Sequence, residues 1–291
     1  MNTVTLRANA KINLMLDIVG RRPDGYHDLI MVMQSVSLYD LLTAERTDEP
    51  GVWLECDHPG MPADNSLVHK AARAFFAHTG ISGGVKFKLQ CRIPMQAGLG
   101  GGSADAAAAL TALNLLYDAG LDEDTLCALG LKLGADVPFC VVGGTRLAKG
   151  VGERLQPLPA PPECGIVLVK PAVGASTAAQ FARADAVPDL PHPSADAMTD
   201  ALQHGDLTAV CAALGNSFES VIGLDEIPQC RQVLLEAGAI GARMTGSGST
   251  VFGIFPSEAA AQAAAPLIQA ALPDCSVFPC RPAAQGIELH R

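Results

Sequence analysis

The chain has 291 residues, 49% of them hydrophobic, and a formal net charge of −10. This length fits one large domain or two of ordinary size, and the acidic balance argues against a nucleic-acid partner. The nine cysteines include no C-x-x-C pair and no apolar run spans a membrane, so we expect a cytoplasmic protein with reduced thiols, no disulfide framework and no membrane partner.

The first half of the chain contains strand and helix patterns in alternation. We predict strands at residues 4–19, 29–42 and 85–93. We predict helices at residues 66–79, 103–117 and 123–133, each followed by a glycine that can end it. In the first strand, apolar and polar residues alternate. This alternation places Lys11 and Asn13 on one polar face and Ile12 on the opposite, apolar face.

A proline-rich segment divides the chain. Residues 156–162 contain four prolines, which cannot lie inside a helix or a central strand. We therefore expect an N-terminal domain at residues 1–158 and a C-terminal domain at residues 159–291. In the second domain we predict strands at residues 165–169, 241–244 and 251–255, and helices at residues 195–203, 207–221, 227–237 and 257–272. Helices mixed with antiparallel-looking strands indicate an α+β fold in both halves.

A glycine-rich segment at residues 94–105 reads Pro-Met-Gln-Ala-Gly-Leu-Gly-Gly-Gly-Ser-Ala-Asp and leads directly into the helix predicted from residue 103. Such a loop can turn its amide N–H groups toward an anion, and the helix adds its positive N-terminus. A flexible turn is the alternative interpretation. If the loop binds phosphate, a nucleotide is its most common source.

Two familiar nucleotide motifs do not fit this loop. A Walker-type loop ends in Gly-Lys-Ser/Thr, whereas Gly102 is followed by Ser103 and Ala104 with no lysine. A dinucleotide fingerprint needs glycine or alanine at position 103 and a buried parallel strand before it. Residues 85–93 instead predict a strand with one polar face. A phosphate-binding lysine must therefore come from elsewhere in the chain.

Residues 94–104 resemble the ATP-binding loop of the GHMP kinase family. Three other segments resemble further motifs of that family, in the same order along the chain. Residues 8–14 resemble its N-terminal strand, residues 134–138 the segment with its acidic residue, and residues 244–252 its C-terminal glycine motif.

Three shorter segments narrow the resemblance within the family. Residues 11–13, 24–27 and 149–153 are similar to members that act on a cytidine-diphosphate-linked polyol in isoprenoid synthesis. The whole resemblance covers about residues 5–255. Because several motifs occur in the same order as in the family, the match is hard to explain by chance.

The resemblance implies a two-domain α+β GHMP kinase fold. Its N-terminal domain would bind the nucleotide, its C-terminal domain would be a ferredoxin-like α/β plait, and the active site would lie in the cleft between them. It implies ATP as the phosphate donor and Mg²⁺ as a cofactor. The residues that it assigns to ATP are Pro94, Met95, Gln96, Ala97, Gly98, Leu99, Gly100, Gly101, Gly102, Ser103 and Ala104.

Asp136 and Lys11 are the catalytic residues that the resemblance implies. Read alone, Asp136 is typical of a helix cap and Lys11 of a solvated strand lysine. In the family reading, Asp136 takes the proton from the substrate hydroxyl, while Lys11 keeps it ionised and contacts the γ-phosphate. Alternation along the strand places Asn13 beside Lys11, where it suits a hydrogen bond to substrate. Ser103 is expected to cap its helix; contact with phosphate or Mg²⁺ stays open, and no other metal ligand is assigned.

The resemblance also implies a cytosine site. Tyr26 would stack on the base, His27 would hydrogen-bond its polar edge, and Phe181 is the candidate for the opposite face. Ordinary turn or core aromatics are the alternative interpretations of these side chains. From the C-terminal domain, a loop is expected to close on the substrate phosphates; its residues are Gly246, Ser247 and Gly248.

Together these residues predict an ATP-dependent kinase that phosphorylates a hydroxyl of a small, cytidine-diphosphate-linked polyol. The alternatives are a kinase of the same family for mevalonate-type, homoserine or sugar substrates, and a nucleotide-binding sensor without chemistry. Tyr26 and His27 favour the cytidine-bearing substrate, and the presence of both Lys11 and Asp136 argues against the sensor. The oligomeric state is left open.

Overall fold

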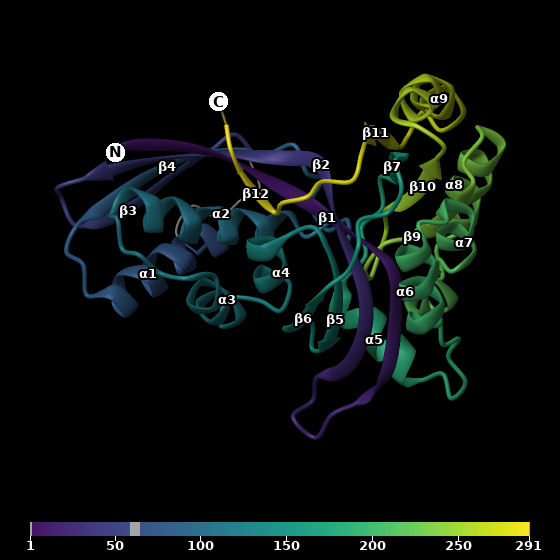
Figure 1. Ribbon diagram of the computed structural model, residues 1–291, viewed down its shortest axis with the longest axis horizontal. Helices are drawn as coiled ribbons and strands as arrows, with labels where there is room; N and C mark the ends of the chain where they lie inside the picture. The colour runs from purple at the N-terminus through teal and green to yellow at the C-terminus, as the bar shows by residue number, and fades with distance from the viewer. Residues whose placement is uncertain (1, 59–64, 291) are drawn as a thin grey trace.

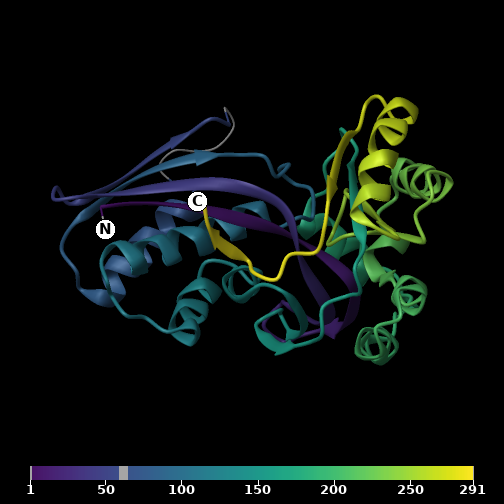
Figure 2. The same cartoon turned by 45° about the horizontal axis from the view of Figure 1, so that its top comes forward.

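The computed structural model describes residues 2–58 and 65–290, and it contains two β-sheets that lie side by side with helices against each (Figures 1 and 2). The larger sheet has the order β12-β1-β2-β4-β3, with β5 and β6 extending from β2 and with β8 beside β1. Its strands are β1 (Thr3–Arg21), β2 (His27–Thr47), β3 (Gly51–Cys56), β4 (Gly84–Gln90), β5 (Thr145–Gly150), β6 (Arg154–Pro157), β8 (Gly215–Asn216) and β12 (Ile287–Leu289).

Four helices lie on one face of the larger sheet (Figure 1). They are α1 (Leu67–Thr79), α2 (Gly101–Leu116), α3 (Glu123–Leu131) and α4 (Val137–Val142). The central helix is α2, whose run of alanines is fully buried and lets it lie close to β1 and β2. The sheet therefore fixes where α2 begins, directly after the glycine-rich loop.

The smaller sheet has the strand order β11-β7-β10-β9, and all its pairs are antiparallel. Numbered along the chain this order is 4-1-3-2, which is that of a ferredoxin-like unit and confirms the predicted α/β plait. Its strands are β7 (Gly165–Lys170), β9 (Gly241–Met244), β10 (Val251–Phe255) and β11 (Ser276–Cys280). Its helices are α5 (Thr177–Asp185), α6 (Ala195–His204), α7 (Leu207–Ala212), α8 (Glu226–Glu236) and α9 (Glu258–Ala271).

Strand β1 is buried on both faces. Ile12 and Leu14 belong to an apolar cluster with Leu168 and Phe252 of the smaller sheet. The other face carries Lys11, which is only 4% exposed. The alternative interpretation of Lys11 as a solvated strand lysine is therefore wrong, because Gly100, Asp136 and Gly246 lie against its side chain.

The chain crosses more than once between the two sheets. After the smaller sheet, β12 returns and pairs antiparallel with β1, Leu6 lying opposite Leu289. The short strand β8, which lies among the helices of the second half, also pairs with β1. The domain boundary at residues 158 and 159 stays a prediction, because strands from both sides of it share one sheet.

One predicted helix is wrong. Residues 207–221 form α7, then β8, then a 3₁₀ helix, η1 (Ser217–Ser220), rather than one continuous helix. The reason is local: Asn216 accepts a hydrogen bond from the backbone N–H of Phe218, which starts the new turn. The sequence pattern also did not predict β3, α4, β5, β6, α5, β11 and β12. Among the described residues, no helix is both long and apolar enough to cross a membrane.

Candidate active site

A cavity of about 960 Å³ lies where the two sheets and their loops meet. Its wall contains residues of the glycine-rich loop, Lys11, Asp136, Phe181 and the 246–248 loop. Of all the residues predicted for the site, only Ala104 does not line this cavity, since it is fully buried in α2. The fold thus brings together side chains that are more than 200 residues apart in the sequence.

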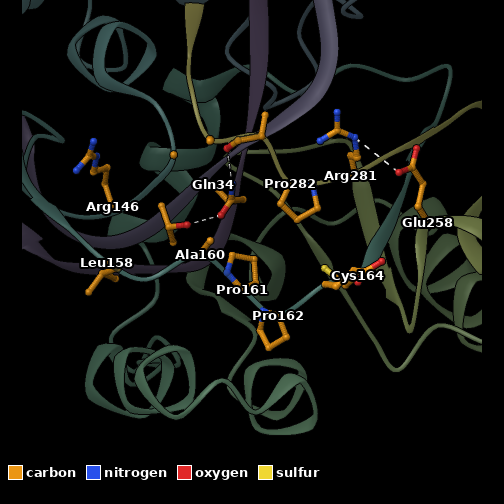
Figure 3. Close-up of a pocket in the computed structure, with 15 residues that line it drawn as sticks. Gln34, Arg146, Leu158, Ala160, Pro161, Pro162, Cys164, Glu258, Arg281 and Pro282 are labelled. Carbon is orange, nitrogen blue, oxygen red and sulfur yellow. Dashed lines mark hydrogen bonds and ion pairs between the residues drawn. The ribbon is translucent and has the colours of Figure 1, made fainter.

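A second cavity, of about 680 Å³, is formed by different residues (Figure 3). It lies between the proline-rich connection and the segment that precedes β12, with Arg281 paired to Glu258 across one side at 3.6 Å. None of the residues predicted for the site lines it. The candidate active site is therefore the 960 Å³ cavity.

Lys11 lies at the centre of the candidate site. Its Nζ atom is 3.4 Å from Asp136 Oδ2 and donates a hydrogen bond to Asn13 Oδ1 at 2.9 Å. The Lys11 side chain is only 5% exposed, whereas 32% of the Asp136 side chain is open to solvent. A carboxylate that is open to the cavity and fixed by a buried ammonium group can accept a proton from a bound hydroxyl.

Asp136 occupies the N-cap position of α4, but its side chain makes no capping hydrogen bond. In a structural cap, the carboxylate oxygens would accept hydrogen bonds from the first backbone N–H groups of the helix. Here the carboxylate is instead directed to Lys11. The geometry thus disfavours the simple capping interpretation of this aspartate.

The glycine-rich loop has the backbone that its composition predicts. Gly98 and Gly100 have φ angles of 76° and 72°, a region that favours glycine. Gly100 is also the N-cap of α2 and offers no side chain to the first turn. Ser103 lies inside that turn, so its predicted capping role is wrong. The N–H groups of this turn have no side-chain acceptor, which suits them to an anion.

The two glycine loops touch each other beside Lys11. A Cβ atom on Gly98 would lie 2.3 Å from the carbonyl oxygen of Thr245, and one on Gly100 would lie 2.9 Å from Lys11 Cγ. Thr245 Oγ1 also accepts a hydrogen bond from the backbone N–H of Asn13 at 2.9 Å. These contacts need residues without side chains at both positions, and they fix the second loop over the first.

Asn216 supports the second loop from below, and the sequence analysis missed it. Its Nδ2 atom donates to the carbonyl oxygens of Met244 and Gly246, at 2.8 and 2.9 Å. The only signal was the Gly215-Asn216 pair inside a helix-like segment. Ser247 Oγ is in addition 2.8 Å from Thr177 Oγ1 at the start of α5, which holds the loop to that helix.

An aromatic group forms part of the cavity wall. The rings of His27 and Phe181 are stacked, with centroids 4.4 Å apart and planes 13° apart. His27 Nε2 lies 2.7 Å from Asp185 Oδ1, a partner that the sequence analysis missed because α5 was not predicted. Tyr26 is 64% exposed at the rim. Since His27 covers one face of Phe181, a base between Tyr26 and Phe181 must use the other face or displace His27.

A pair of buried carboxyl groups lies behind the glycine-rich loop. Asp40 on β2 accepts hydrogen bonds from the backbone N–H groups of Arg92 and Ile93, and it also bonds to Asp105 on α2. Burial raises the pKa of Asp40 to about 6. Burial and the nearby charge of Asp40 raise the pKa of Asp105 well above its usual value, so this pair holds a proton at neutral pH.

Family models match both halves of the chain. The GHMP kinases N terminal domain matches residues 66–144, and the GHMP kinases C terminal domain matches residues 198–274. With the ferredoxin-like plait, the glycine-rich loop and the lysine–aspartate pair in place, the chain belongs to the GHMP kinase family.

Relatives within the family are similar over most of their length. A 4-diphosphocytidyl-2-C-methyl-D-erythritol kinase of Lachnoclostridium phytofermentans is 41% identical over 91% of this chain and 92% of its own. One from a Synechococcus species is 45% identical over 90% and 89%. A crystal structure of 4-(cytidine 5'-diphospho)-2C-methyl-D-erythritol kinase matches with a TM-score of 0.80 and 35% identity, covering 96% of this chain and 99% of the other.

More distant structures share the fold alone. A homoserine kinase from Cytophaga hutchinsonii has a TM-score of 0.81 at 18% identity, covering 100% of this chain and 98% of the other. The TM-score is as high for this homoserine kinase as for the 35% identical kinase structure. The TM-score therefore does not distinguish substrate classes within the family.

Proposed function

We propose that this chain is an ATP-dependent kinase that phosphorylates the C2 hydroxyl of 4-diphosphocytidyl-2-C-methyl-D-erythritol. The observation that carries the proposal is the 3.4 Å contact between Lys11 and Asp136, held between two glycine loops in one cavity. The names of relatives at about 40% identity supply the substrate. The aromatic group in the cavity wall supports a base-bearing substrate.

The phosphate donor would bind along the glycine-rich loop. The first turn of α2 offers backbone N–H groups without a side-chain cap, and the helix adds its positive end. Lys11 lies with its stem against Gly100 and its ammonium group near the loop, where it would contact the transferred phosphate. It would thus replace the lysine that this loop lacks in its own sequence.

Asp136 would act as the general base. The C2 oxygen attacks the γ-phosphorus, its proton passes to the Asp136 carboxylate, and the bond from the γ-phosphorus to the bridging oxygen breaks to release ADP. The buried ammonium of Lys11 would keep the carboxylate ionised and offset charge on the phosphoryl group. Catalysis would rest mainly on positioning and charge stabilisation.

The cavity also fits Mg²⁺, which neutralises phosphate charge when it is bound. This ion prefers oxygen ligands and takes only one or two from the protein, the others being phosphates and water. The Ser103 side chain lies in the first turn of α2 and lines this cavity. Its hydroxyl oxygen would hold the ion together with phosphate oxygens and water.

The cytidine end of the substrate would lie among Tyr26, His27 and Phe181. His27 is oriented by Asp185, which leaves the other nitrogen of its ring for a polar base edge. Tyr26 is exposed at the rim and free to stack. We place the diphosphate between this group and the 246–248 loop.

The test is ADP release by the purified protein with ATP, Mg²⁺ and a panel of alcohols: the cytidine-linked polyol, mevalonate, homoserine and galactose. We expect turnover with the first alone. Asp136→Asn should lower turnover by ~10²–10⁴-fold and leave ATP binding in place, because it removes only the base. Asp124→Asn, the same change at an exposed position of α3, is the control.

Three outcomes would contradict the proposal. Near-normal turnover of Asp136→Asn would show that Asp136 is not the general base. Turnover with another alcohol of the panel would assign a different substrate in the same family. ATP binding without phosphate transfer to any alcohol would indicate a nucleotide sensor.

A further inference from the structure

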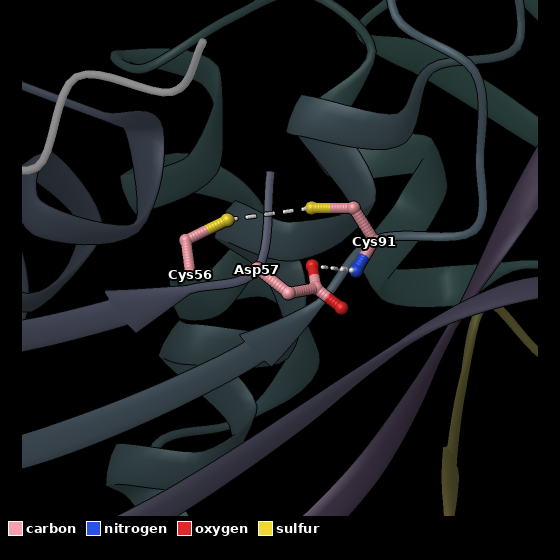
Figure 4. Close-up of side chains that lie close together, drawn as sticks. All are labelled: Cys56, Asp57 and Cys91. Carbon is pink, nitrogen blue, oxygen red and sulfur yellow. Dashed lines mark hydrogen bonds between the residues drawn. The ribbon is translucent and has the colours of Figure 1, made fainter. Parts of the chain in front are cut away.

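Two cysteines and an aspartate gather at the ends of two neighbouring strands (Figure 4). Cys56 is the last residue of β3 and Asp57 follows it, while Cys91 follows the last residue of β4. The two strands are parallel, with Cys56 opposite Leu89, so Cys91 comes two residues further along the same edge. One ligand atom from each of the three residues lies within 4.8 Å of the others.

We propose that Cys56, Asp57 and Cys91 form a binding site for a thiophilic divalent cation of the zinc class. The two Sγ atoms are 3.6 Å apart and point toward each other in Figure 4. A tetrahedral zinc ion with Zn–S bonds of about 2.3 Å holds its sulfur ligands ~3.8 Å apart. The two thiols thus already have the separation that such an ion needs, whereas a disulfide needs about 2.05 Å.

Hydrogen bonds hold the proposed ligands in place. Asp57 Oδ1 accepts the backbone N–H of Cys91 at 2.9 Å, so one carboxylate oxygen is fixed and the second is left for the ion. The backbone N–H of His58 donates to Cys56 Sγ at 3.4 Å, a contact that favours a thiolate at this position. Partners of this kind orient the ligands of metal sites.

Metal binding at this site requires both thiols to lose their protons, because thiolates rather than thiols bind such an ion. The ion would replace these two protons and offset the charge of the two thiolates and the Asp57 carboxylate.

The site is separate from the proposed catalytic groups. Cys91 lines the wall of the 960 Å³ cavity, but Cys56 and Asp57 do not. Within residues 2–58 and 65–290, no other His, Cys, Asp or Glu joins the group, so a water molecule would complete four-coordination. A bound ion would join the end of β3 to the segment that leads from β4 into the glycine-rich loop.

The test is a titration of the full-length, reduced, metal-free protein with Co²⁺, a spectroscopic substitute for Zn²⁺. We expect one equivalent to give the strong thiolate-to-metal absorption in the near ultraviolet, and Zn²⁺ to abolish it. The band should be lost in Cys56→Ser and in Cys91→Ser. The matched control is Cys275→Ser, because Cys275 belongs to another close pair, with 3.9 Å between its Sγ atom and that of Cys230.

If a cysteine variant fails to fold, Asp57→Asn provides a second test. Asp57 is exposed, so we expect this variant to fold normally. It should retain the thiolate band but need a higher Co²⁺ concentration to reach it. The proposal is overturned by absence of a thiolate band in the unaltered protein, or by a band that Cys56→Ser leaves unchanged. Formation of a Cys56–Cys91 disulfide in air with no Co²⁺ bound by the reduced protein would overturn it as well.

Discussion

Asp105 has an unusual environment for a carboxyl group. It is 3% exposed, one of its oxygens has no hydrogen-bond partner among the described residues, and the carboxyl group of Asp40 lies beside it. The two groups avoid like-charge repulsion only while one proton stays between them. Because Asp40 also holds the backbone of Arg92 and Ile93, this proton affects the segment that enters the glycine-rich loop.

Stability should therefore fall as pH rises from about 4 through 6 and above. The folded pKa of Asp40 is about 6 against an ordinary 3.8, so in this range the native state binds more protons than the unfolded state. Asp105→Asn keeps a donor toward Asp40 but has no proton to lose. This variant should reduce the slope of the free energy of unfolding against pH by up to ~1.4 kcal/mol per pH unit.

Urea unfolding at several pH values measures this slope. Asp189→Asn, at an exposed position, is the control and should leave the slope unchanged. An Asp105→Asn slope equal to that of the unaltered protein would show that the pair does not share a proton in the native state.

Asp185 gives a second prediction for a single residue. It orients His27 through a 2.7 Å contact, so Asp185→Asn should raise KM for the cytidine-linked substrate by about tenfold and leave KM for ATP nearly unchanged. Arg21→Ala removes the exposed partner of the same carboxylate, 3.5 Å away, and should have little effect. Steady-state kinetics with each substrate varied in turn measures both. An equal rise in both KM values would contradict a local role.

The sequence allowed part of the site to be predicted residue by residue. Alternation correctly placed Asn13 beside Lys11, because side chains two apart on a strand share a face. It could not show that this face is buried, since the covering loops come from distant parts of the chain. Asp185 lies on a helix whose first turn shows no strong apolar pattern, and it was missed for that reason.

Among the elements, the contact between the two glycine loops is the most sensitive to substitution. Gly98→Ala would bring a Cβ atom to 2.3 Å from the Thr245 carbonyl oxygen, which neither backbone can avoid. We expect at least a tenfold loss of kcat/KM, because the second loop moves away from Lys11. Gly120→Ala is the matched control: its φ of 65° is similar, and nothing lies within 4 Å.

The two variants separate backbone strain from loop contact. Both should lose about 1 kcal/mol of stability from the positive φ angle, and Gly98→Ala should lose about 1–3 kcal/mol more from overpacking, measured by thermal or urea unfolding. Only Gly98→Ala should also lose activity. Equal activity of the two variants would show that the loops need not touch for turnover.

Helices and strands with a strong local pattern could be predicted, and short or irregular ones could not. The alanine-rich helix was found within two residues of its start, because Gly100 to Gly102 mark its beginning. The prediction of one helix at residues 207–221 was wrong. The Asn216 side chain donates a hydrogen bond to the carbonyl oxygen of Met244 and accepts one from the backbone N–H of Phe218, and these bonds stabilise a turn instead of a continued helix. Such a role depends on tertiary contacts that no local pattern contains.

At the scale of the whole molecule, the C-terminal segment supports the helix that carries Asp136. Gly286 packs so closely that a Cβ atom on it would lie 1.9 Å from the Cys140 carbonyl oxygen in α4. Asn9 in β1 bonds to the same segment, through its side chain to Gln285 and through its backbone N–H to Gly286. The segment that leads into β12 thus contacts both α4 and β1.

Gly286→Ala should therefore disturb both stability and catalysis. We expect a loss of about 1–3 kcal/mol from overpacking, together with a lower kcat because α4 shifts. Gly20→Ala, with nothing within 4 Å, should change neither. Urea unfolding and steady-state kinetics measure the two effects. Normal kcat in a destabilised Gly286→Ala protein would show that α4 is held by its other contacts alone.

The return of β12 could not be predicted, because three residues carry too little pattern to indicate a strand or its partner. It places the two ends of the described chain side by side, with the backbone N–H of His290 donating to the carbonyl oxygen of Thr5 at 2.9 Å. A short linker could join these ends, and the proline-rich connection at residues 156–162 would then be a place to open new ones. The kinase could in this way be rearranged into a circular permutant in which the two sheets exchange their order along the chain.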